Sequence, residues 1–143
     1  MTTQLAPFSI RDCREEDIEA VLKLWGQADA TPSITDNAEN LRRALGRAQV
    51  LLANVHGTLV GSIIGTFDGW RGNIYRLAVH PAYRRPGIAR ALVAEVEKRL
   101  VREGAKRVTA LVEHSHPWAV AFLTAVGYRR DERIARHVRT IDR

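Results

Sequence analysis

The chain has 143 residues and a net charge of +6, and its hydrophobic and charged fractions of 45% and 27% are typical of globular proteins. This length fits one domain, 1–143, and the composition excludes collagen-like, low-complexity and coiled-coil proteins. No stretch approaches the roughly 18 apolar residues of a membrane span, and residues 1–10 lack the features of a secretory signal. Because the single cysteine, Cys13, cannot form an intrachain disulfide, we expect a cytoplasmic protein without membrane association.

The charge is unevenly distributed along the chain. Residues 1–70 hold six Lys and Arg against nine Asp and Glu, a balance of −3, and residues 71–143 hold 16 against seven, a balance of +9. A basic half suggests a polyanionic partner, and the phosphates of a small cofactor or of nucleic acid both qualify. Because few aromatic residues accompany the scattered basic ones, we expect no nucleic-acid binding. Solvated helix faces are the alternative interpretation.

The apolar periodicity of the first half predicts two helices, a hairpin and two further strands. In chain order, the elements are a strand at 8–11, a helix from the acidic run 15–17 to Trp25, a helix over 36–47, and strands over 49–55, 59–67 and 74–79.

The second half alternates strands and helices. In chain order, an irregular loop at 84–87 precedes a helix over 88–103, a strand over 108–112, a helix over 117–125 and one or two final strands within 128–141. The unit from 74 to 112 is a crossover connection, so its two strands are expected to be parallel neighbours. The remaining hairpins predict an α/β fold with a mixed sheet and helices on both faces.

The loop between the strand 74–79 and the helix 88–103 is the candidate site for chemistry. Free N–H groups and the dipole at a helix start attract anions, and Gly87 lets the backbone come close to a phosphate. The small Ala89 leaves room for phosphate oxygens. Forked donors for phosphate are added by three arginines: Arg84, Arg85 and Arg90. Neither Gly-x-x-x-x-Gly-Lys-Ser/Thr nor Gly-x-Gly-x-x-Gly is present. The sequence therefore lacks the main signature of a site for a nucleoside triphosphate or a dinucleotide.

Three segments together resemble the GNAT family of N-acetyltransferases. Arg84-x-x-Gly87-x-Ala89 is similar to the family's Gln/Arg-x-x-Gly-x-Gly/Ala loop, and Val79-His80-Pro81-x-Tyr83 precedes it as in the family. Ala119-x-x-Phe122-x-x-x-x-Gly127-Tyr128 follows with Gly-Tyr in place of the usual Gly-Phe. The resemblance runs from Ile10 to about Arg130, and 65–72 is similar to small bacterial members.

The resemblance implies a mostly antiparallel sheet of six or seven strands, in which two parallel strands splay apart around acetyl-CoA as cosubstrate. It implies that the pantetheine arm and thioester are held by the backbone of Leu77, Ala78 and Val79. The pyrophosphate is expected on the backbone of Arg85, Gly87, Ile88 and Ala89. Further cofactor contacts are expected from Arg84, Arg90, His116 and Phe122. Pro86 departs from the family pattern because it has no N–H to donate.

The implied reaction is direct transfer of the acetyl group of acetyl-CoA to a primary amine within a ternary complex. The family often places a Tyr general acid directly after the position of Phe122, where this chain has Leu123. Because a thiol has a pKa near 8.5, the thiolate can leave without an acid. Tyr128 and Tyr75 are the substitute candidates. The missing acid motivates the alternative of a non-catalytic acyl-CoA-binding regulatory module.

Three residues just past the strand 108–112 are candidates for the base that takes the amine proton. They are Glu113, His114 and His116, and a solvated loop end is the alternative interpretation. Two His and one Glu without a further cluster are thin evidence for a metal, so no metal is expected.

In the family, the first two helices and the turn before the splayed strand shape the acceptor pocket. The candidates there are Trp25, Asp29, Asp68, Trp70 and Arg71. Their carboxylates and aromatic rings suit a cationic amine, although the spacing of Trp25 with Leu22 also fits a core residue. The identity of the acceptor stays open. Family members are often dimers, and the resemblance therefore suggests a homodimer that pairs through a terminal strand 133–141.

Overall fold

The structure is a computed structural model that describes residues 7–28, 30–84, 87–113 and 116–141. It divides into two compact units, Met1–Val112 and Glu113–Arg143. The first unit holds a sheet and three α-helices, and the second holds one α-helix followed by a segment with neither helix nor strand. The single domain expected from chain length therefore stays a prediction.

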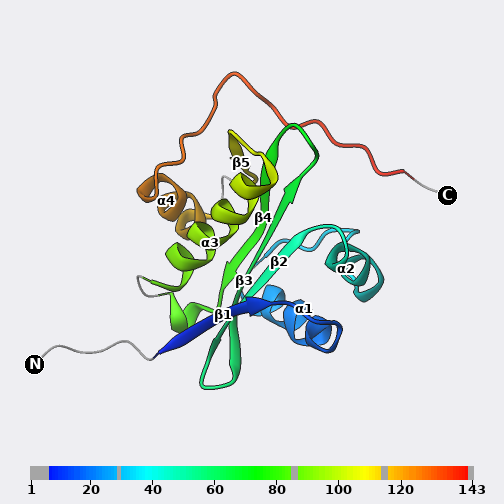
Figure 1. Cartoon of the computed structure of the whole chain (residues 1–143), viewed down its shortest axis with the longest axis vertical. Helices are drawn as coiled ribbons and strands as arrows, with labels where there is room; N and C mark the ends of the chain where they lie inside the picture. Colours follow the sequence, from blue (N-terminus) through cyan, green and yellow to red (C-terminus); the bar gives the residue numbers. More distant parts are fainter. Residues whose placement is uncertain (1–6, 29, 85–86, 114–115, 142–143) are drawn as a thin grey trace, which may run out of the picture. The chain divides into compact units, whose positions relative to one another are not determined.

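The sheet of the first unit has five strands in the order β1-β2-β3-β4-β5 (Figure 1). They are β1 (Phe8–Asp12), β2 (Gln49–Val55), β3 (Thr58–Phe67), β4 (Gly72–Val79) and β5 (Val108–Ala110). β1 to β4 pair antiparallel with their neighbours, and β4 and β5 pair in parallel. The mixed, mostly antiparallel sheet and the parallel crossover pair are thus confirmed.

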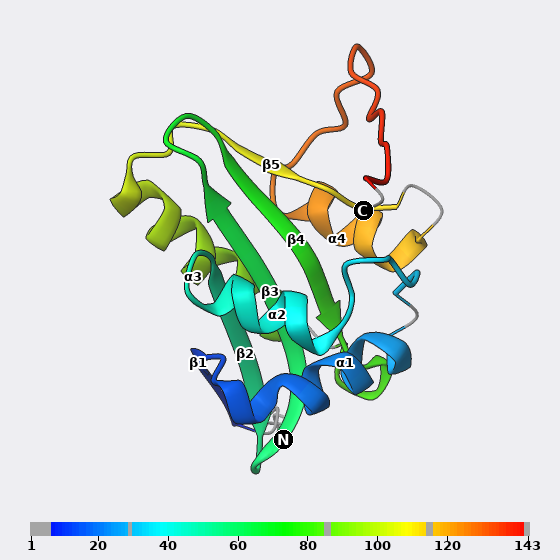
Figure 2. The same cartoon turned by 90° about the vertical axis from the view of Figure 1, so that its right-hand side faces the viewer.

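Helices lie on both faces of this sheet. Figure 2 views it from the side of α1 (Ile18–Gln27) and α2 (Ala38–Leu45), and α3 (Ile88–Glu103) lies on the other side. Two short 3-10 helices, η1 (Glu15–Asp17) and η2 (Pro81–Tyr83), precede α1 and α3. None of the helices in the described ranges is long and apolar enough to cross a bilayer.

The core on the α1 side follows from helical spacing. Ile18, Val21 and Trp25 lie on one face of α1, because residues three to four positions apart share a face. They pack against Leu52 and Ala78 of the sheet, and all five residues are buried. Helix α1 is thereby fixed over β3 and β4, and its apolar face shares one core cluster with β2.

The core on the α3 side depends on glycines in β3. A Cβ at Gly65 would lie 2.3 Å from Cγ2 of Val96, so the helix and the sheet approach more closely there than a side chain allows. We expect Gly65→Ala to lower the free energy of unfolding by about 2 kcal/mol, measured by urea denaturation, because the added methyl group overpacks the interface. Gly46→Ala, where no atom lies within 4 Å of the added Cβ, is the control. Equal unfolding midpoints for the two variants would contradict the close approach.

The prediction of six or seven strands is wrong for the described part of the chain, which has five. The segment 128–141 forms neither helix nor strand. Its apolar residues Ile134, Val138 and Ile141 are exposed. In a regular strand Ile141 would point to the opposite face from Ile134 and Val138. A strand needs alternate apolar residues to bury one face, and this segment offers no such face. β5 also ends at Ala110, two residues before the end predicted for it.

Candidate functional site

β4 and β5 separate partway along β4. They pair only from Gly72 opposite Val108 to Ile74 opposite Ala110, with one further hydrogen bond from Leu111 N to the carbonyl oxygen of Ile74 at 3.1 Å. β4 then continues to Val79, and no β5 residue pairs with its last five residues. The two parallel strands therefore diverge as the family resemblance implies, and one backbone edge of β4 lacks a β5 partner.

A β-bulge interrupts the other edge of β4. The pairing of β3 with β4 shifts between Ser62, which lies opposite Ala78, and Ile64, which lies opposite Tyr75. Within the bulge Arg76 has a φ of 51°. This left-handed conformation costs a residue with a side chain roughly 1 kcal/mol and is concentrated at functional sites. The bulge re-aims the backbone that follows it, which is the predicted thioester-holding segment Leu77–Val79.

A buried relay of hydrogen bonds holds the bulge. The indole Nε1 of Trp25 donates to Ser62 Oγ at 2.9 Å, and Ser62 Oγ donates to the carbonyl oxygen of Arg76 at 3.2 Å. Ser62 is the only polar or charged residue among the buried residues of the described chain. Sequence reasoning missed it, and the available signal was a serine inside the apolar stretch 59–64.

The loop after β4 is braced by Arg84. Its Nε donates to the carbonyl oxygen of Val79 at 2.8 Å, and its Nη2 donates to the carbonyl oxygen of Ala28 at 3.0 Å. Arg84 thus ties the loop to the end of β4 and to the end of α1. Its predicted contact with the cofactor stays a prediction.

The helix start after this loop has the predicted form. Gly87 adopts φ 130° and ψ −53° immediately before α3, a conformation that strains any residue with a Cβ. Ile88 and Ala89 are buried and Arg90 is exposed. The first backbone N–H groups of an α-helix have no intrahelical acceptor, so this turn offers donors to an anion. Arg85 lies outside the described residues.

Three acceptor candidates lie together at the opposite end of β4. Asp68 Oδ1 accepts hydrogen bonds from the backbone N–H groups of Trp70 and Arg71 at 2.8 and 2.7 Å. These bonds, that from Arg71 first, hold the pKa of the Asp68 carboxyl below its usual range. The Arg71 guanidinium stacks over the exposed Trp70 ring at 4.3 Å. Along β4, at about 3.3 Å per residue, this turn lies roughly 20 Å from Val79.

The other two acceptor candidates belong to the α1 region. Trp25 is buried, 6% exposed, and its ring packs in the core beside the Arg76 guanidinium at 5.2 Å. It therefore acts at least as a core residue, and its contact with an acceptor stays a prediction. Asp29 lies outside the described residues.

The remaining candidates lie in the second unit. His116 caps α4 (Pro117–Ala125), where its Nδ1 accepts from Ala119 N at 3.4 Å. Trp118 lies between the rings of His116 and Phe122, with ring centroids 6.2 and 5.9 Å away.

The catalytic candidates of the second unit stay predictions. Glu113 is exposed, and the N–H of the half-buried Tyr128 donates to the carbonyl oxygen of Leu123 at 2.9 Å. Leu123, at the family's usual Tyr position, is buried. His114 lies outside the described residues.

The chain is similar to known acetyltransferases over most of its length. Residues 8–128 match the Acetyltransferase (GNAT) family. "Acetyltransferase ECA0875" of Pectobacterium atrosepticum is 34% identical over 123 residues, which are 85% of this chain and 87% of that protein.

Solved structures share the fold. The PaiA N-acetyltransferase of Thermoplasma acidophilum, solved with coenzyme A, has a TM-score of 0.76 at 18% identity and covers 88% of this chain and 92% of its own. The aminoglycoside N-acetyltransferase AAC(6')-Iy, also solved with coenzyme A, has a TM-score of 0.78 at 15% identity over 99% and 100%.

The family match includes every element that builds the candidate site. It begins at the first residue of β1 and ends at Tyr128, just beyond α4. The diverging strands, the bulge and the glycine-led helix start all fall inside it. The chain therefore belongs to the acetyltransferase (GNAT) family.

Proposed function

We propose that this protein transfers the acetyl group of acetyl-CoA directly to a primary amine in a ternary complex. The observation that carries the proposal is one continuous arrangement: β4 diverges from β5 after Ile74, bulges at Arg76 and leads into the helix start at Gly87. The free strand edge suits the amide groups of a pantetheine arm, and the helix start suits a pyrophosphate.

The chain's own groups supply binding and polarisation. The backbone of Leu77–Val79 is proposed to hold the pantetheine arm, with a β4 backbone N–H, that of Val79 by the family pattern, donating to the thioester oxygen where charge develops. The N–H groups of Gly87, Ile88 and Ala89 are proposed to bind the pyrophosphate. The proposed contacts with acetyl-CoA use no metal.

The transfer balances with few protein groups. The neutral amine nitrogen attacks the thioester carbon, a C–N bond forms, the C–S bond breaks and the electron pair leaves on sulfur as coenzyme A thiolate. The nitrogen loses a proton through water to a base, for which Glu113, His114 and His116 are the candidates. With Leu123 at the usual acid position, solvent or Tyr128 protonates the thiolate, whose ordinary pKa near 8.5 makes it a good leaving group.

A thiol-release assay with acetyl-CoA and a panel of amines tests the activity, alongside calorimetry with coenzyme A. Release that depends on the amine supports transfer. Tight coenzyme A binding with no release for any amine would instead favour the non-catalytic acyl-CoA-binding module. Absence of both would remove the proposal.

The lone cysteine should not disturb that assay. Burial raises the pKa of the Cys13 thiol to about 11, against 9.0 for the unperturbed group. At pH 8 the thiolate population then falls roughly 100-fold, and labelling by a disulfide reagent should slow by the same factor because the thiolate is the nucleophile. Stopped-flow labelling of the native protein and of the urea-unfolded chain measures the difference. Equal rates would show that Cys13 is reactive in the folded protein.

We also propose a cytoplasmic protein that binds no nucleic acid and forms a homodimer. Size-exclusion chromatography with light scattering tests the homodimer.

A further inference from the structure

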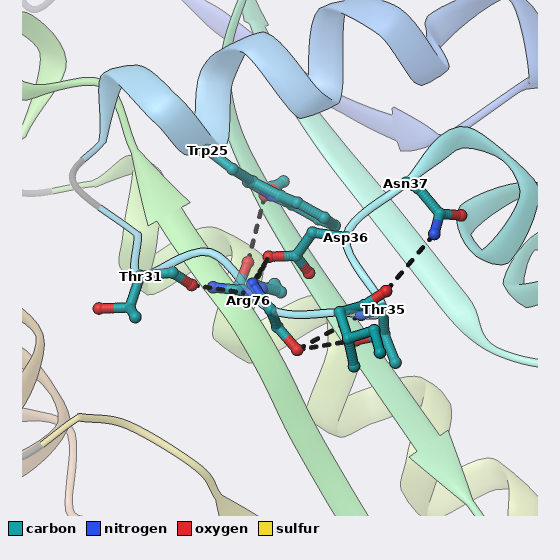
Figure 3. A network of polar contacts seen from close by, with 9 residues as sticks. Trp25, Thr31, Thr35, Asp36, Asn37 and Arg76 are labelled. Atoms are coloured by element: carbon teal, nitrogen blue, oxygen red, sulfur yellow. Dashed lines mark hydrogen bonds and ion pairs between the residues drawn. The ribbon is translucent and has the colours of Figure 1, made fainter. Parts of the chain in front are cut away.

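The bulge residue Arg76 directs its side chain away from β3 toward the connection between α1 and α2. Its Nη2 donates to the carbonyl oxygen of Thr31 at 3.1 Å and pairs with Asp36 Oδ2 (Figure 3). The ring of Trp25 lies beneath the guanidinium. Arg76 and Asp36 retain 21% and 18% of their side-chain exposure, so the pair is neither sealed in the core nor free in solvent.

These contacts fix a side chain that is ordinarily flexible. Immobilising an arginine side chain costs up to about 2 kcal/mol in conformational entropy. Here the contacts with Thr31, Asp36 and Trp25 already immobilise it in the folded protein, so a ligand would not add this cost. Asp36 is itself held, because its Oδ2 also accepts from the backbone N–H of Ser33 at 3.0 Å. The guanidinium is therefore preorganised, as a recognition group should be.

The contacts leave most of the guanidinium's donors unused. Both hydrogen bonds from the Arg76 side chain to described residues come from Nη2, and its Nε and Nη1 donate to none of them. An arginine presents five N–H donors in a planar fork that matches a carboxylate with two parallel hydrogen bonds. One edge of a positioned fork thus remains available.

The position of Arg76 relates this fork to the reaction. It directly precedes Leu77, the first residue of the proposed thioester-holding segment, and it faces the α1–α2 connection. An acceptor amine approaching the thioester from that side would bring its substituents to the guanidinium. We propose that Arg76 binds a carboxylate of the acceptor, so that the acceptors are amino acids or other amines carrying a carboxylate. This inference rests on the proposed acetyl transfer.

A purely structural ion pair is the competing explanation, since Asp36 and Arg76 also tie the α1–α2 connection to the sheet. The two explanations differ in what they predict for matched acceptors. A structural role affects all acceptors alike, whereas a carboxylate-binding role affects only those with a carboxylate. The test therefore compares amines that differ in that one group.

The experiment measures kcat/KM for glycine, β-alanine, 4-aminobutyrate, glutamate and lysine, each beside its primary carboxamide. We expect the native protein to prefer the acid in at least one pair. In that pair, Arg76→Gln should lower the acid-to-amide ratio at least about tenfold, as expected for the loss of hydrogen bonds between charged groups. Arg76→Lys keeps the charge but lacks the fork, so it should lower the acid-to-amide ratio several-fold. This variant also tests the inference if Arg76→Gln fails to fold.

Arg42→Gln is the matched control, because Arg42 makes an exposed ion pair with Glu15 at 2.7 Å on the surface of α2. It should leave the ratio unchanged. Equal losses for acid and amide in the Arg76 variants, or a native preference for the amide in every pair, would overturn the inference.

The carboxylate site can be tested even if the protein transfers no acetyl group. If no amine releases thiol, calorimetry with the coenzyme A-loaded protein still compares binding of each acid and amide. Binding of acids that is weakened by Arg76→Gln supports the carboxylate site, although the proposed activity has failed. Absence of any such binding overturns the site.

Discussion

Gly87→Trp is expected to weaken acetyl-CoA binding at least about 100-fold. Gly87 adopts φ 130° just before α3, a conformation that a residue with a Cβ reaches only with strain. An indole there also occupies the space above the helix start, where the pyrophosphate is proposed to accept backbone hydrogen bonds. Hydrogen bonds to charged groups contribute about 1.5–3 kcal/mol each, so the loss of two accounts for the expected factor. Isothermal titration calorimetry with coenzyme A measures it.

Gly57→Trp separates the binding effect from backbone strain. Gly57 also has a positive φ, 79°, but it lies in the β2–β3 turn and no atom lies within 4 Å of an added Cβ. This control should lose stability while keeping its affinity for coenzyme A. If Gly87→Trp folded and bound coenzyme A as tightly as the native protein, the helix start would not be the pyrophosphate site.

Ser62→Ala is expected to lower the free energy of unfolding by about 3 kcal/mol and to slow acetyl transfer. The change leaves the indole N–H of Trp25 and the carbonyl oxygen of Arg76 without the partner that both have in the native protein. Each buried polar group left unpaired costs roughly 1–3 kcal/mol. Because the lost hydroxyl also holds the bulge, the following backbone should present the thioester less well, and kcat should fall more than the affinity for coenzyme A.

Urea denaturation and steady-state kinetics check this prediction. Ser9→Ala, an exposed serine on β1, is the matched control and should change stability by less than about 0.5 kcal/mol. In a cycle with Trp25→Phe, the double variant should cost clearly less than the sum of the single variants, because both remove the same hydrogen bond. Additive losses would show that the relay is not a coupled unit.

Local sequence patterns sufficed for the elements that have strong periodicity. The apolar residues of α1 recur at helical spacing, and Gly104 ends α3 in the left-handed conformation favoured by glycine. The start of α3 after Gly87 was predictable in the same way, because the apolar periodicity of 88–103 begins directly after that glycine. The one or two final strands predicted within 128–141 are absent from the structure, because the residues of this segment lack the alternation that a strand requires.

The bulge and its network could not be predicted from the sequence. The residue type of Arg76 does not predict its φ of 51°, because arginine rarely adopts a positive φ. The partners of Arg76 are 40 and 45 residues away in the chain, at Asp36 and Thr31, so only the folded sheet brings them together. The same holds for Trp25, whose helical spacing fits a core residue and whose indole N–H nevertheless meets Ser62.

The sequence by itself determined the order of the elements in the first 112 residues, the anion-attracting helix start and the family resemblance, because these depend on neighbours within a few residues of one another. The tertiary structure decided where β4 leaves β5, which residue occupies the bulge and which guanidinium contacts the α1–α2 connection. These features depend on register and on contacts between distant segments. Strand register changes the face of every side chain, and no local pattern encodes a contact between residues that only folding brings together.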